Sequence, residues 1–227
     1  YRGIFRRHGI PPERIIMVGN SLESDILPVL ALGGVGVHVP YHLTWAAERV
    51  DEAPRADTSV EKLARLQPVF RPDGTVTAGN ASTLADGAAL VLLASEESLA
   101  RHGLKPRARI VGAAEVGCDP ATMGLGPVPA VRRLLAETGW PLETVDHIEI
   151  NEAFSAQVVG CARELALDPA RLNARGGAVA LGHPLGASGA RVLVTLVHQL
   201  KRTGGKRGLI TMCIGGGQGI ALAIERI

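Results

Sequence analysis

One stretch constrains this chain more than any other part of the sequence. Residues 176–191 read GGAVALGHPLGASGAR and place His183 in a turn bounded by glycine and proline. The apolar residues Ala178–Leu181 before the turn predict the end of a buried strand. Helical spacing of apolar residues after it predicts a helix over Ala187–Lys201, with Ser188 near its start. A histidine beside a helix N-terminus can serve an anionic transition state, and a turn histidine without a task is the alternative.

Composition and charge set wider limits. The chain has 227 residues, of which 46% are hydrophobic, and this predicts one ordinary α/β domain with an additional segment. A net charge of +2 gives no electrostatic case for nucleic acid or for a membrane surface. No apolar run approaches membrane-spanning length, and no signal peptide is visible. We therefore expect neither nucleic-acid nor membrane partners.

The cysteines indicate a compartment. Cys118, Cys161 and Cys213 have no paired spacing, which argues against a disulfide framework and excludes a zinc cluster. Free cysteines of this kind are typical of a reducing environment. We therefore expect a cytoplasmic protein.

The first sixty or so residues have a character of their own. A short strand over Ile15–Val18, a polar turn over Gly19–Asp25, a helix over Ser24–Leu32 and a strand over Val35–Val39 together predict a parallel βαβ unit. The segment MVGNSLESDILPVLALG resembles the last motif of haloacid-dehalogenase-like phosphatases, a Rossmann-like hydrolase family. That resemblance implies Asp25 as a magnesium ligand, although Asn20 stands where many members carry an aspartate.

A missing motif argues against hydrolase activity. Phosphoryl transfer in that family uses a nucleophilic aspartate in an Asp-x-Asp motif, and no Asp-x-Asp occurs in this sequence. A lone acidic turn cannot form the phospho-intermediate. We therefore expect Asp25 to be a vestigial ligand or a helix N-terminal residue, and magnesium to matter only if this segment were functional.

A seam is predicted between Asp51 and Phe70. Residues 51–59 (DEAPRADTS) are polar and interrupted by proline, as linkers often are. Tyr1 falls inside what reads as a structural element, so we expect a fragment or a fused chain. The predicted organisation is a hydrolase-like segment over residues 1–60, a junction over 61–103 and a C-terminal domain over 104–227. Recombination, deliberate fusion and an assembly error would leave the same sequence.

The rest of the chain alternates strands and helices. Strands are predicted over Ala88–Leu93, Arg109–Glu115 and Ile148–Ile150, and a hairpin around GGGQG over Gly208–Ile227. Between them we expect a helix containing Val131 that ends at Gly139, and a helix capped by Ser155. The glycines of GGGQG do not form a dinucleotide fingerprint, because no helix follows the turn.

Three blocks in order resemble the thiolase family. GGAVALGHPLGASGAR resembles its histidine block, NEAF at Asn151–Phe154 its asparagine block, and MCIGGGQG at Met212–Gly219 its C-terminal cysteine block. The resemblance runs from about Leu63 to Ile227. It implies an α/β half-domain, with a mixed five-stranded sheet and helices on both faces. It also implies acyl-CoA C-acyltransferase activity, by Claisen condensation of thioesters or thiolysis of a 3-oxoacyl-CoA.

The resemblance implies four catalytic residues. Cys213 would act as acid and base, and His183 would activate the nucleophile and donate to the thioester oxygen. Asn151 would hold a water in the same oxyanion site, and Gly215 would offer its backbone N–H to a second oxyanion. From the residues alone, Cys213 reads equally as a small buried hydrophobe. Cys118 and Cys161 lie outside the setting of the family's nucleophile, which belongs to its N-terminal half.

The resemblance also implies substrate contacts. Ser82, in the GNAS loop, would lie near the pantetheine arm of coenzyme A, Met123 would line its tunnel, and Phe154, in the asparagine block, would also bind the substrate. A solvated loop and a core methionine are the alternatives for Ser82 and Met123. Thr83 and Ala85 replace the usual glycine and asparagine, which affects the loop geometry. Acyl-CoA thioesters are the implied substrates, with no separate cofactor.

Three functions follow from these readings. The first is an acyltransferase component that lacks the nucleophilic cysteine and is inactive alone. The second is a non-catalytic fusion or interaction module, and the third a magnesium-dependent phosphohydrolase. Because the helix after His183 would lose part of its cover, we also expect the chain to form an oligomer or to need a partner.

Overall fold

Two short strands are described in the amino-terminal unit. The computed structural model describes residues 16–19, 35–38 and 57–227, in two units, Tyr1–Val50 and Asp51–Ile227. In the first unit, β1 (Ile16–Gly19) pairs in parallel with β2 (Val35–His38), which confirms both predicted strands and their direction. The helix predicted over residues 24–32, with Asn20 and Asp25, lies outside the described residues.

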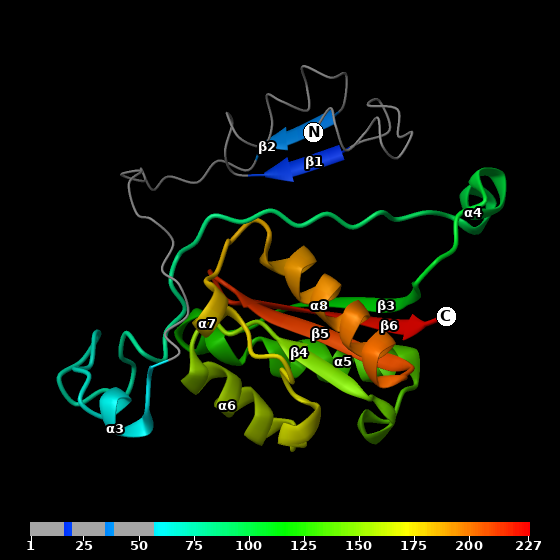
Figure 1. The fold of residues 1–227 in the computed structure, drawn as a ribbon. Helices are drawn as coiled ribbons and strands as arrows, with labels where there is room; N and C mark the ends of the chain where they lie inside the picture. Colours follow the sequence, from blue (N-terminus) through cyan, green and yellow to red (C-terminus); the bar gives the residue numbers. More distant parts are fainter. Residues whose placement is uncertain (1–15, 20–34, 39–56) are drawn as a thin grey trace. The chain divides into compact units, whose positions relative to one another are not determined.

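The second unit is built on a mixed sheet of four strands (Figure 1). The strands are β3 (Ala108–Gly117), β4 (His147–Ile150), β5 (Arg207–Ile214) and β6 (Gln218–Arg226), in the order β3-β6-β5-β4. β4 and β5 are parallel, whereas β5–β6 and β6–β3 are antiparallel. The predicted mixed sheet and the C-terminal hairpin are confirmed.

The predicted count of five strands is wrong, because Ala178–Leu181 forms the helical turn α7. A carboxylate oxygen of Glu152 accepts the backbone N–H of Val179 at 3.1 Å, and the N–H groups of residues 180 and 181 bond to the carbonyl of Gly177. Four apolar residues suit a buried strand and a single helical turn equally well. A carboxylate at the start of the turn decides between them.

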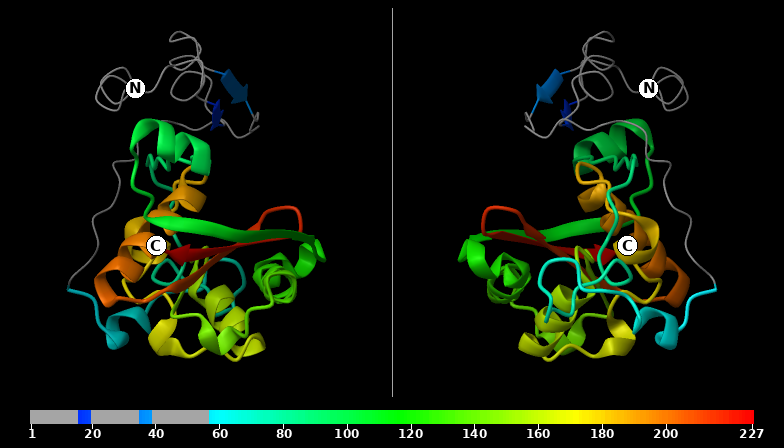
Figure 2. Two further views of the ribbon diagram at one scale, coloured as in Figure 1. Left: turned by 90° about the vertical axis from the view of Figure 1, so that its right-hand side faces the viewer. Right: turned by 90° about the vertical axis from the view of Figure 1, so that its left-hand side faces the viewer.

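Helices cover both faces of the sheet, as predicted (Figures 1 and 2). α5 (Pro127–Thr138) and α6 (Ser155–Glu164) pack on one face and α8 (Ser188–Thr203) on the other. Alternation along the strands separates the two cores. The core under α5 and α6 includes Leu134, Cys161, Leu209, Ala221 and Ala223, and the core under α8 includes Leu196, Leu200 and Ile224.

The predicted helix ends are partly confirmed. Gly139 ends α5 in the left-handed conformation at φ 67°, as the sequence predicts. Ser155 does not cap α6: it is the first helical residue, and the extended Phe154 precedes it. The backbone N–H of Ser155 instead donates to the carbonyl of Asn80 at 2.8 Å. The unpaired group at this helix start is therefore satisfied by a distant loop rather than by a local side chain.

The strand predicted over Ala88–Leu93 is also wrong. Its residues run without a ladder partner among residues 57–227, and Leu90, Leu92 and Leu93 are exposed. An apolar extended segment becomes a strand only where a sheet edge accepts its hydrogen bonds. The remaining short elements are α3 (Val60–Leu63), α4 (Glu96–His102), η3 (Pro120–Leu125), η4 (Leu142–Thr144) and η5 (Pro169–Arg171). None of the described helices is long and apolar enough to cross a bilayer.

Candidate active site

His183 and Asn151 meet at the carboxyl ends of β4 and β5. Asn151 follows β4 directly, is fully buried, and is held by the hydrogen bond from its backbone N–H to the carbonyl of Thr211, 3.0 Å away. His183 occupies the predicted turn before α8. Its Nε2 lies 3.3 Å from Nδ2 of Asn151. The fold therefore brings together the two residues that the asparagine and histidine blocks contribute.

The hydrogen bonds around His183 define its tautomer. Ser188 Oγ donates to the carbonyl of Pro184 at 3.1 Å, so it accepts from Nδ1 of His183, 2.6 Å away. The proton is thereby assigned to Nδ1, and the lone pair on Nε2 faces the amide of Asn151. Burial lowers the pKa of His183, and the positive charge of Arg191 lowers it further. The imidazole is therefore neutral near pH 7 and can accept a proton at Nε2.

Two ionisable residues next to Asn151, the half-buried Arg191 and the buried Glu149, are not among the residues predicted from the sequence. Arg191 donates from Nη2 to Oδ1 of Asn151 at 3.2 Å. Glu149, only 1% exposed, lies two residues before Asn151 on β4 and interacts electrostatically with Arg191. Burial raises the pKa of Glu149 to about 7, against the opposing pull of the guanidinium. A signal was present: charged residues stand inside the apolar runs HIEI and GARVLV.

The raised pKa of Glu149 predicts a stability that declines with pH. Its carboxyl stays neutral to about pH 7 in the folded chain but only to its ordinary value of 4.5 when unfolded. The folded state thus binds the extra proton, and the free energy of unfolding falls between about pH 5 and pH 8, by at most about 3 kcal/mol. Urea unfolding across this range should show that Glu149→Gln removes the decline.

His183 contributes with the opposite sign, because its lowered pKa reduces stability as the pH falls below its ordinary value of 6.5. The comparison is therefore between variant and parent at each pH. Glu143→Gln, which removes an exposed carboxylate, is the matched control. A parent and a Glu149→Gln variant with parallel pH profiles would contradict the prediction.

The GNAS loop is docked on both sides of the His183–Asn151 pair. The backbone N–H of His183 donates to the carbonyl of Thr83 at 2.7 Å. The backbone N–H and the hydroxyl of Ser82 both donate to the carbonyl of Ala153, at 3.1 and 3.0 Å. The loop therefore joins the histidine block to the asparagine block, and Thr83 contributes through its backbone.

Phe154 and Met123 occupy different surroundings. The Phe154 ring packs edge-to-face on Phe70, with 6.0 Å between the ring centroids. Phe154 also forms an antiparallel bridge with Ala81, next to Ser82. Met123 is half-buried in η3, and its carbonyl accepts the backbone N–H of Gly126 at 3.0 Å. Phe154 thus belongs to the loop assembly around His183, whereas no interaction within residues 57–227 links Met123 to that assembly.

Cys213 lies near the end of β5 on the side of α5 and α6. It shares that side with Leu209 by strand alternation, and it is 9% exposed. Burial raises the pKa of its thiol, and Cys118 raises it further. Within residues 57–227, no hydrogen bond joins Cys213 to His183 or Asn151. The structure thus brings Cys213 to the same end of the sheet as these residues but not into direct contact with them.

The other cysteines differ in exposure. Cys161 is fully buried, its Sγ lies 3.3 Å from the carbonyl of Gly124, and burial raises its pKa to about 11. Cys118 is half-exposed, and its N–H holds the GGGQG turn through the carbonyl of Gly217 at 2.7 Å. Gly215 in that turn is exposed, and no atom of residues 57–227 other than its chain neighbours lies within 4 Å of a Cβ built on it. The backbone of Gly215 is thus accessible to a ligand.

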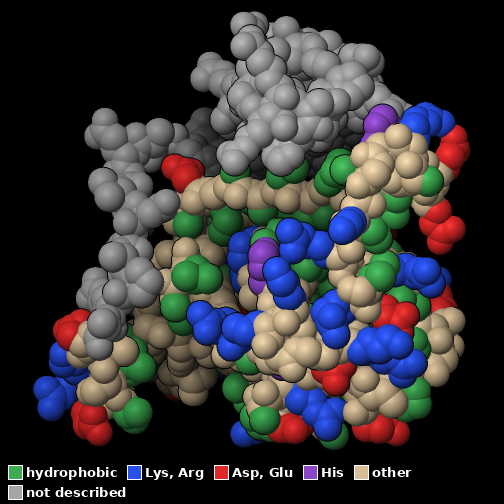
Figure 3. All heavy atoms as spheres, turned by 45° about the vertical axis from the view of Figure 1, so that its right-hand side comes forward, with side chains coloured by type: hydrophobic (Ala, Val, Ile, Leu, Met, Phe, Trp, Pro, Cys, Tyr) green, Lys and Arg blue, Asp and Glu red, His purple; other side chains and the backbone are tan. Residues whose placement is uncertain are grey.

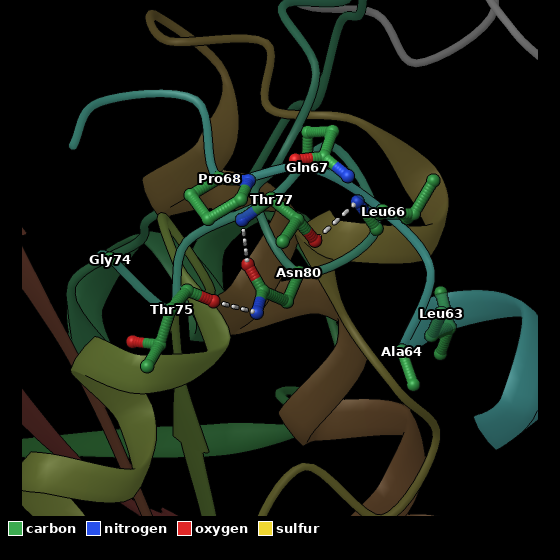
Figure 4. A pocket seen from close by; sticks show the side chains of 10 residues that line it. Leu63, Ala64, Leu66, Gln67, Pro68, Gly74, Thr75, Thr77 and Asn80 are labelled. Atoms are coloured by element: carbon green, nitrogen blue, oxygen red, sulfur yellow. Dashed lines mark hydrogen bonds between the residues drawn. The ribbon is translucent and has the colours of Figure 1, made fainter. Parts of the chain in front are cut away.

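Two pockets lie away from this centre. The first lies between α3 and the loop over residues 67–80, and none of its described lining residues is ionisable (Figure 4). In this pocket the Asn80 side chain accepts from the backbone N–H of Thr77 and donates to the carbonyl of Thr75, each at 2.8 Å. The second lies beside α8 and is lined in part by Arg175, His198, Lys201 and Arg202. Lys and Arg side chains gather around a histidine on the face drawn in Figure 3. Neither pocket contains His183 or Asn151.

No metal centre is found in the described part of the chain, where no three His, Cys, Asp or Glu residues are grouped suitably. Asp25 lies outside that part.

Comparisons with known proteins agree with the three blocks. The family model described as "Thiolase, C-terminal domain" matches residues 104–226, more than half of the chain. The chain belongs to the thiolase family. The model "Thiolase, N-terminal domain" also matches this thiolase chain, over residues 21–97.

The curated relatives of the thiolase chain are about twice as long as the segment that matches it. A beta-ketoadipyl-CoA thiolase of Pseudomonas aeruginosa is 53% identical over 206 residues, which cover 90% of this chain and 49% of that protein. An acetyl-CoA acetyltransferase of the same species is 60% identical over 176 residues, covering 78% and 45%. The chain thus spans about half the length of the curated relatives it matches.

Solved thiolase structures share the fold. The Bacillus anthracis acetyl-CoA acetyltransferase superposes with a TM-score of 0.76 at 50% identity, over 84% of this chain and 49% of that one. The human mitochondrial 3-ketoacyl-CoA thiolase in complex with CoA gives a TM-score of 0.73 at 48% identity, over 79% and 46%.

The haloacid-dehalogenase-like interpretation of residues 1–60 receives no support from these matches. The N-terminal thiolase model covers residues 21–60 of that range as well as the residues that follow. The hydrolase resemblance and the fused origin therefore stay predictions, and no activity is carried forward from them.

Proposed function

We propose that this chain supplies the acid–base and oxyanion part of an acyl-CoA C-acyltransferase of the thiolase type. The observation that supports the proposal best is the pairing of His183 Nε2 with the Asn151 amide at 3.3 Å, with the GNAS loop bonded to both segments. A basic nitrogen and an amide N–H in one polar cleft suit a thioester whose oxygen gains negative charge.

The two residues divide the work at the carbonyl group. The lone pair on Nε2 takes the proton of an attacking thiol, and the resulting Nε2–H then donates to the developing oxyanion. Asn151 donates to the same oxygen through a water. The Nδ1–H bond to Ser188, at 2.6 Å, stabilises the imidazolium in this step. These assignments follow from the tautomer and agree with the family resemblance.

Cys213 would act at carbon rather than at oxygen. In the thiolysis direction the bond between C2 and C3 of a 3-oxoacyl-CoA breaks, and the enolate of the shorter thioester needs a proton at C2. Burial raises the pKa of Cys213 and keeps its thiol protonated, which is the form that can donate. Within residues 57–227 Cys213 has no hydrogen bond to His183, which fits the assignment of the two residues to different reacting atoms. Gly215, with open space beside it, would donate its N–H to the second oxyanion.

The substrate-binding roles of Ser82, Met123 and Phe154 rest on position. Ser82 and Phe154 lie in the assembly that carries His183, which suits contact with a coenzyme A thioester. Met123 would take part only if the tunnel extends along η3. We propose acyl-CoA thioesters as the substrates.

None of the three cysteines fits the nucleophile of this reaction. Cys161 is buried with a pKa of about 11, and Cys213 is assigned to proton transfer. Cys118 holds the GGGQG turn through its backbone, and within residues 57–227 no hydrogen bond joins it to His183. We therefore expect the chain alone to show no thiolysis of acetoacetyl-CoA above background.

A chimera tests the proposal directly. The segment of this chain that matches the Pseudomonas aeruginosa acetyl-CoA acetyltransferase over 176 residues would replace the corresponding segment of that enzyme. At 60% identity the replacement should fold, and we expect thiolysis within about tenfold of the parent enzyme, since the acid–base set is complete. A folded chimera without turnover would contradict the proposal and favour a non-catalytic interaction module. The exposed leucines at positions 90, 92 and 93 would be its natural contact surface.

A further inference from the structure

Arg191 bonds the side chain of Asn151, and Glu149 lies two residues before Asn151 on β4. Neither residue takes part in the chemistry proposed above. Nε and Nη1 of Arg191 are buried and have no hydrogen-bond partner among the described residues, and the same holds for Oε2 of Glu149. Within residues 57–227, the one hydrogen bond of the Arg191 guanidinium runs from Nη2 to Oδ1 of Asn151, at 3.2 Å. Burying polar atoms without hydrogen-bond partners costs free energy, even where the rest of the side chain is half-exposed, so this arrangement calls for a role.

The position of Arg191 on α8 is also unfavourable by itself. It lies in the first turn of the helix, where the dipole presents partial positive charge and basic residues are disfavoured. Above its pKa of about 7, Glu149 on β4 supplies a compensating carboxylate from the neighbouring strand. The strand β4 and the helix α8 thus hold the Arg191 guanidinium at a position that neither helix propensity nor hydrophobic packing favours.

The guanidinium can recognise only one end of the Asn151 amide. Arginine has donors and no acceptor, so it bonds the amide oxygen and turns the NH2 group toward His183. An NH2 group facing Nε2 requires a lone pair there. If the amide turned over, its oxygen would face Nε2 and would favour a proton on that nitrogen instead. The orientation of one amide therefore decides which nitrogen of His183 is basic.

We infer that Arg191 is a positioning residue, which fixes the Asn151 amide so that Nε2 of His183 keeps its lone pair, with Glu149 as the counter-charge. A catalytic benefit from this positioning depends on the proposed acyltransferase function of the chain. The Nδ1 side agrees independently, because the Ser188 hydroxyl is committed to the carbonyl of Pro184. The protonation of both imidazole nitrogens of His183 is thus determined by groups that do not react themselves.

The test reads the tautomer of His183 directly in the full chain. With ¹⁵N-labelled histidine, and His183→Gln used to assign its signals, the parent chain should show the Nδ1–H form at pH 8. Arg191→Met should shift the ratio of the two tautomers toward Nε2–H by at least about fivefold, the worth of one ordinary hydrogen bond. The same variant should raise the pKa of His183, because it removes the nearby positive charge.

Controls separate positioning from folding. Arg132→Met removes an exposed arginine that bonds the carbonyl of Glu164 at 2.9 Å, and it should leave the tautomer unchanged. If Arg191→Met does not fold, the double variant Glu149→Gln/Arg191→Met leaves no unpaired buried carboxylate, and it should show the same shift. A folded single or double variant with the parent's tautomer ratio would overturn the inference.

The readout does not depend on turnover. An inactive chimera would count against the proposed function alone, because the tautomer is measured in the chain itself. In an active chimera, Arg191→Met should lower kcat by about tenfold or more with little change in KM, since Arg191 lies behind Asn151 rather than against the substrate. A variant that raises KM at unchanged kcat would place Arg191 in substrate binding and overturn the positioning role.

Discussion

Replacing His183 with alanine in the active chimera should lower kcat for thiolysis of acetoacetyl-CoA by about a thousandfold or more. Removal of a general base costs about 10²- to 10⁴-fold, and removal of an oxyanion donor costs about 10²- to 10³-fold. His183 is proposed to do both through one nitrogen, so the two losses do not simply add. The effect should fall on kcat, because both interactions strengthen in the transition state.

The matched control is His198→Ala. His198 is an exposed histidine ten residues after Ser188 on the same helix, and it lines the basic pocket beside α8. Its removal should change kcat by less than about twofold, as is usual for surface substitutions away from a site. Circular dichroism and melting would show that both variants fold. A loss below about tenfold for His183→Ala would mean that another group takes the proton.

Strong local patterns predicted their elements well. The sequence predicts the helix after His183 over residues 187–201, and the helix is found over Ser188–Thr203, because its apolar spacing and flanking glycines agree. The C-terminal hairpin was correct for a similar reason: GGGQG fits a turn, and too few residues follow it for a crossover helix. In both places the information lies within the segment itself.

Elements decided by distant partners were predicted less well. Ala178–Leu181 became a helical turn because Glu152, some twenty-five residues away, supplies its first acceptor. The start of α6 is satisfied by Asn80 rather than by Ser155. Local propensity cannot distinguish these outcomes, since the deciding hydrogen bonds come from tertiary contacts.

The sequence predicts the reacting residues of the site but not the residues that orient them. His183 and Asn151 stand in blocks with recognisable spacing, and the structure brings them into contact. Arg191 and Glu149 carry no motif, and only their presence in apolar segments marks them. A buried charge in an amphipathic pattern is therefore the signal to examine when a reacting residue needs a fixed orientation.

A different region of the fold should be unusually sensitive to one methyl group. Gly219, at the start of β6, faces the carbonyl group of Gly126, where α5 begins. A Cβ built on Gly219 overlaps that backbone carbonyl, and a Cβ on Gly126 would lie 2.5 Å from the carbonyl oxygen of Gln218. The two glycines therefore let the helix start and the strand approach backbone to backbone.

Gly219→Ala should accordingly lower the free energy of unfolding by about 4 kcal/mol, more than the usual 1–3 kcal/mol of overpacking. The overlapping atom is backbone, so no side chain can rotate away to relieve it. Because Gly219 pairs with Cys213 across the hairpin, the strain should also displace the proposed acid. Urea unfolding measures the first effect, and the rate of alkylation of Cys213 measures the second.

The same turn provides the control. Gly215→Ala places a methyl group where, apart from its two chain neighbours, no atom of the described residues lies within 4 Å, so its free energy of unfolding should stay within about 0.5 kcal/mol of the parent. Gly217, at φ 91°, is unsuitable as a control because a side chain there is strained whatever the space. Equal losses for Gly215→Ala and Gly219→Ala would show that the hairpin tolerates no side chain in general. A stable Gly219→Ala would instead mean that α5 can move away from β6, and the close approach would then be no constraint on the position of Cys213.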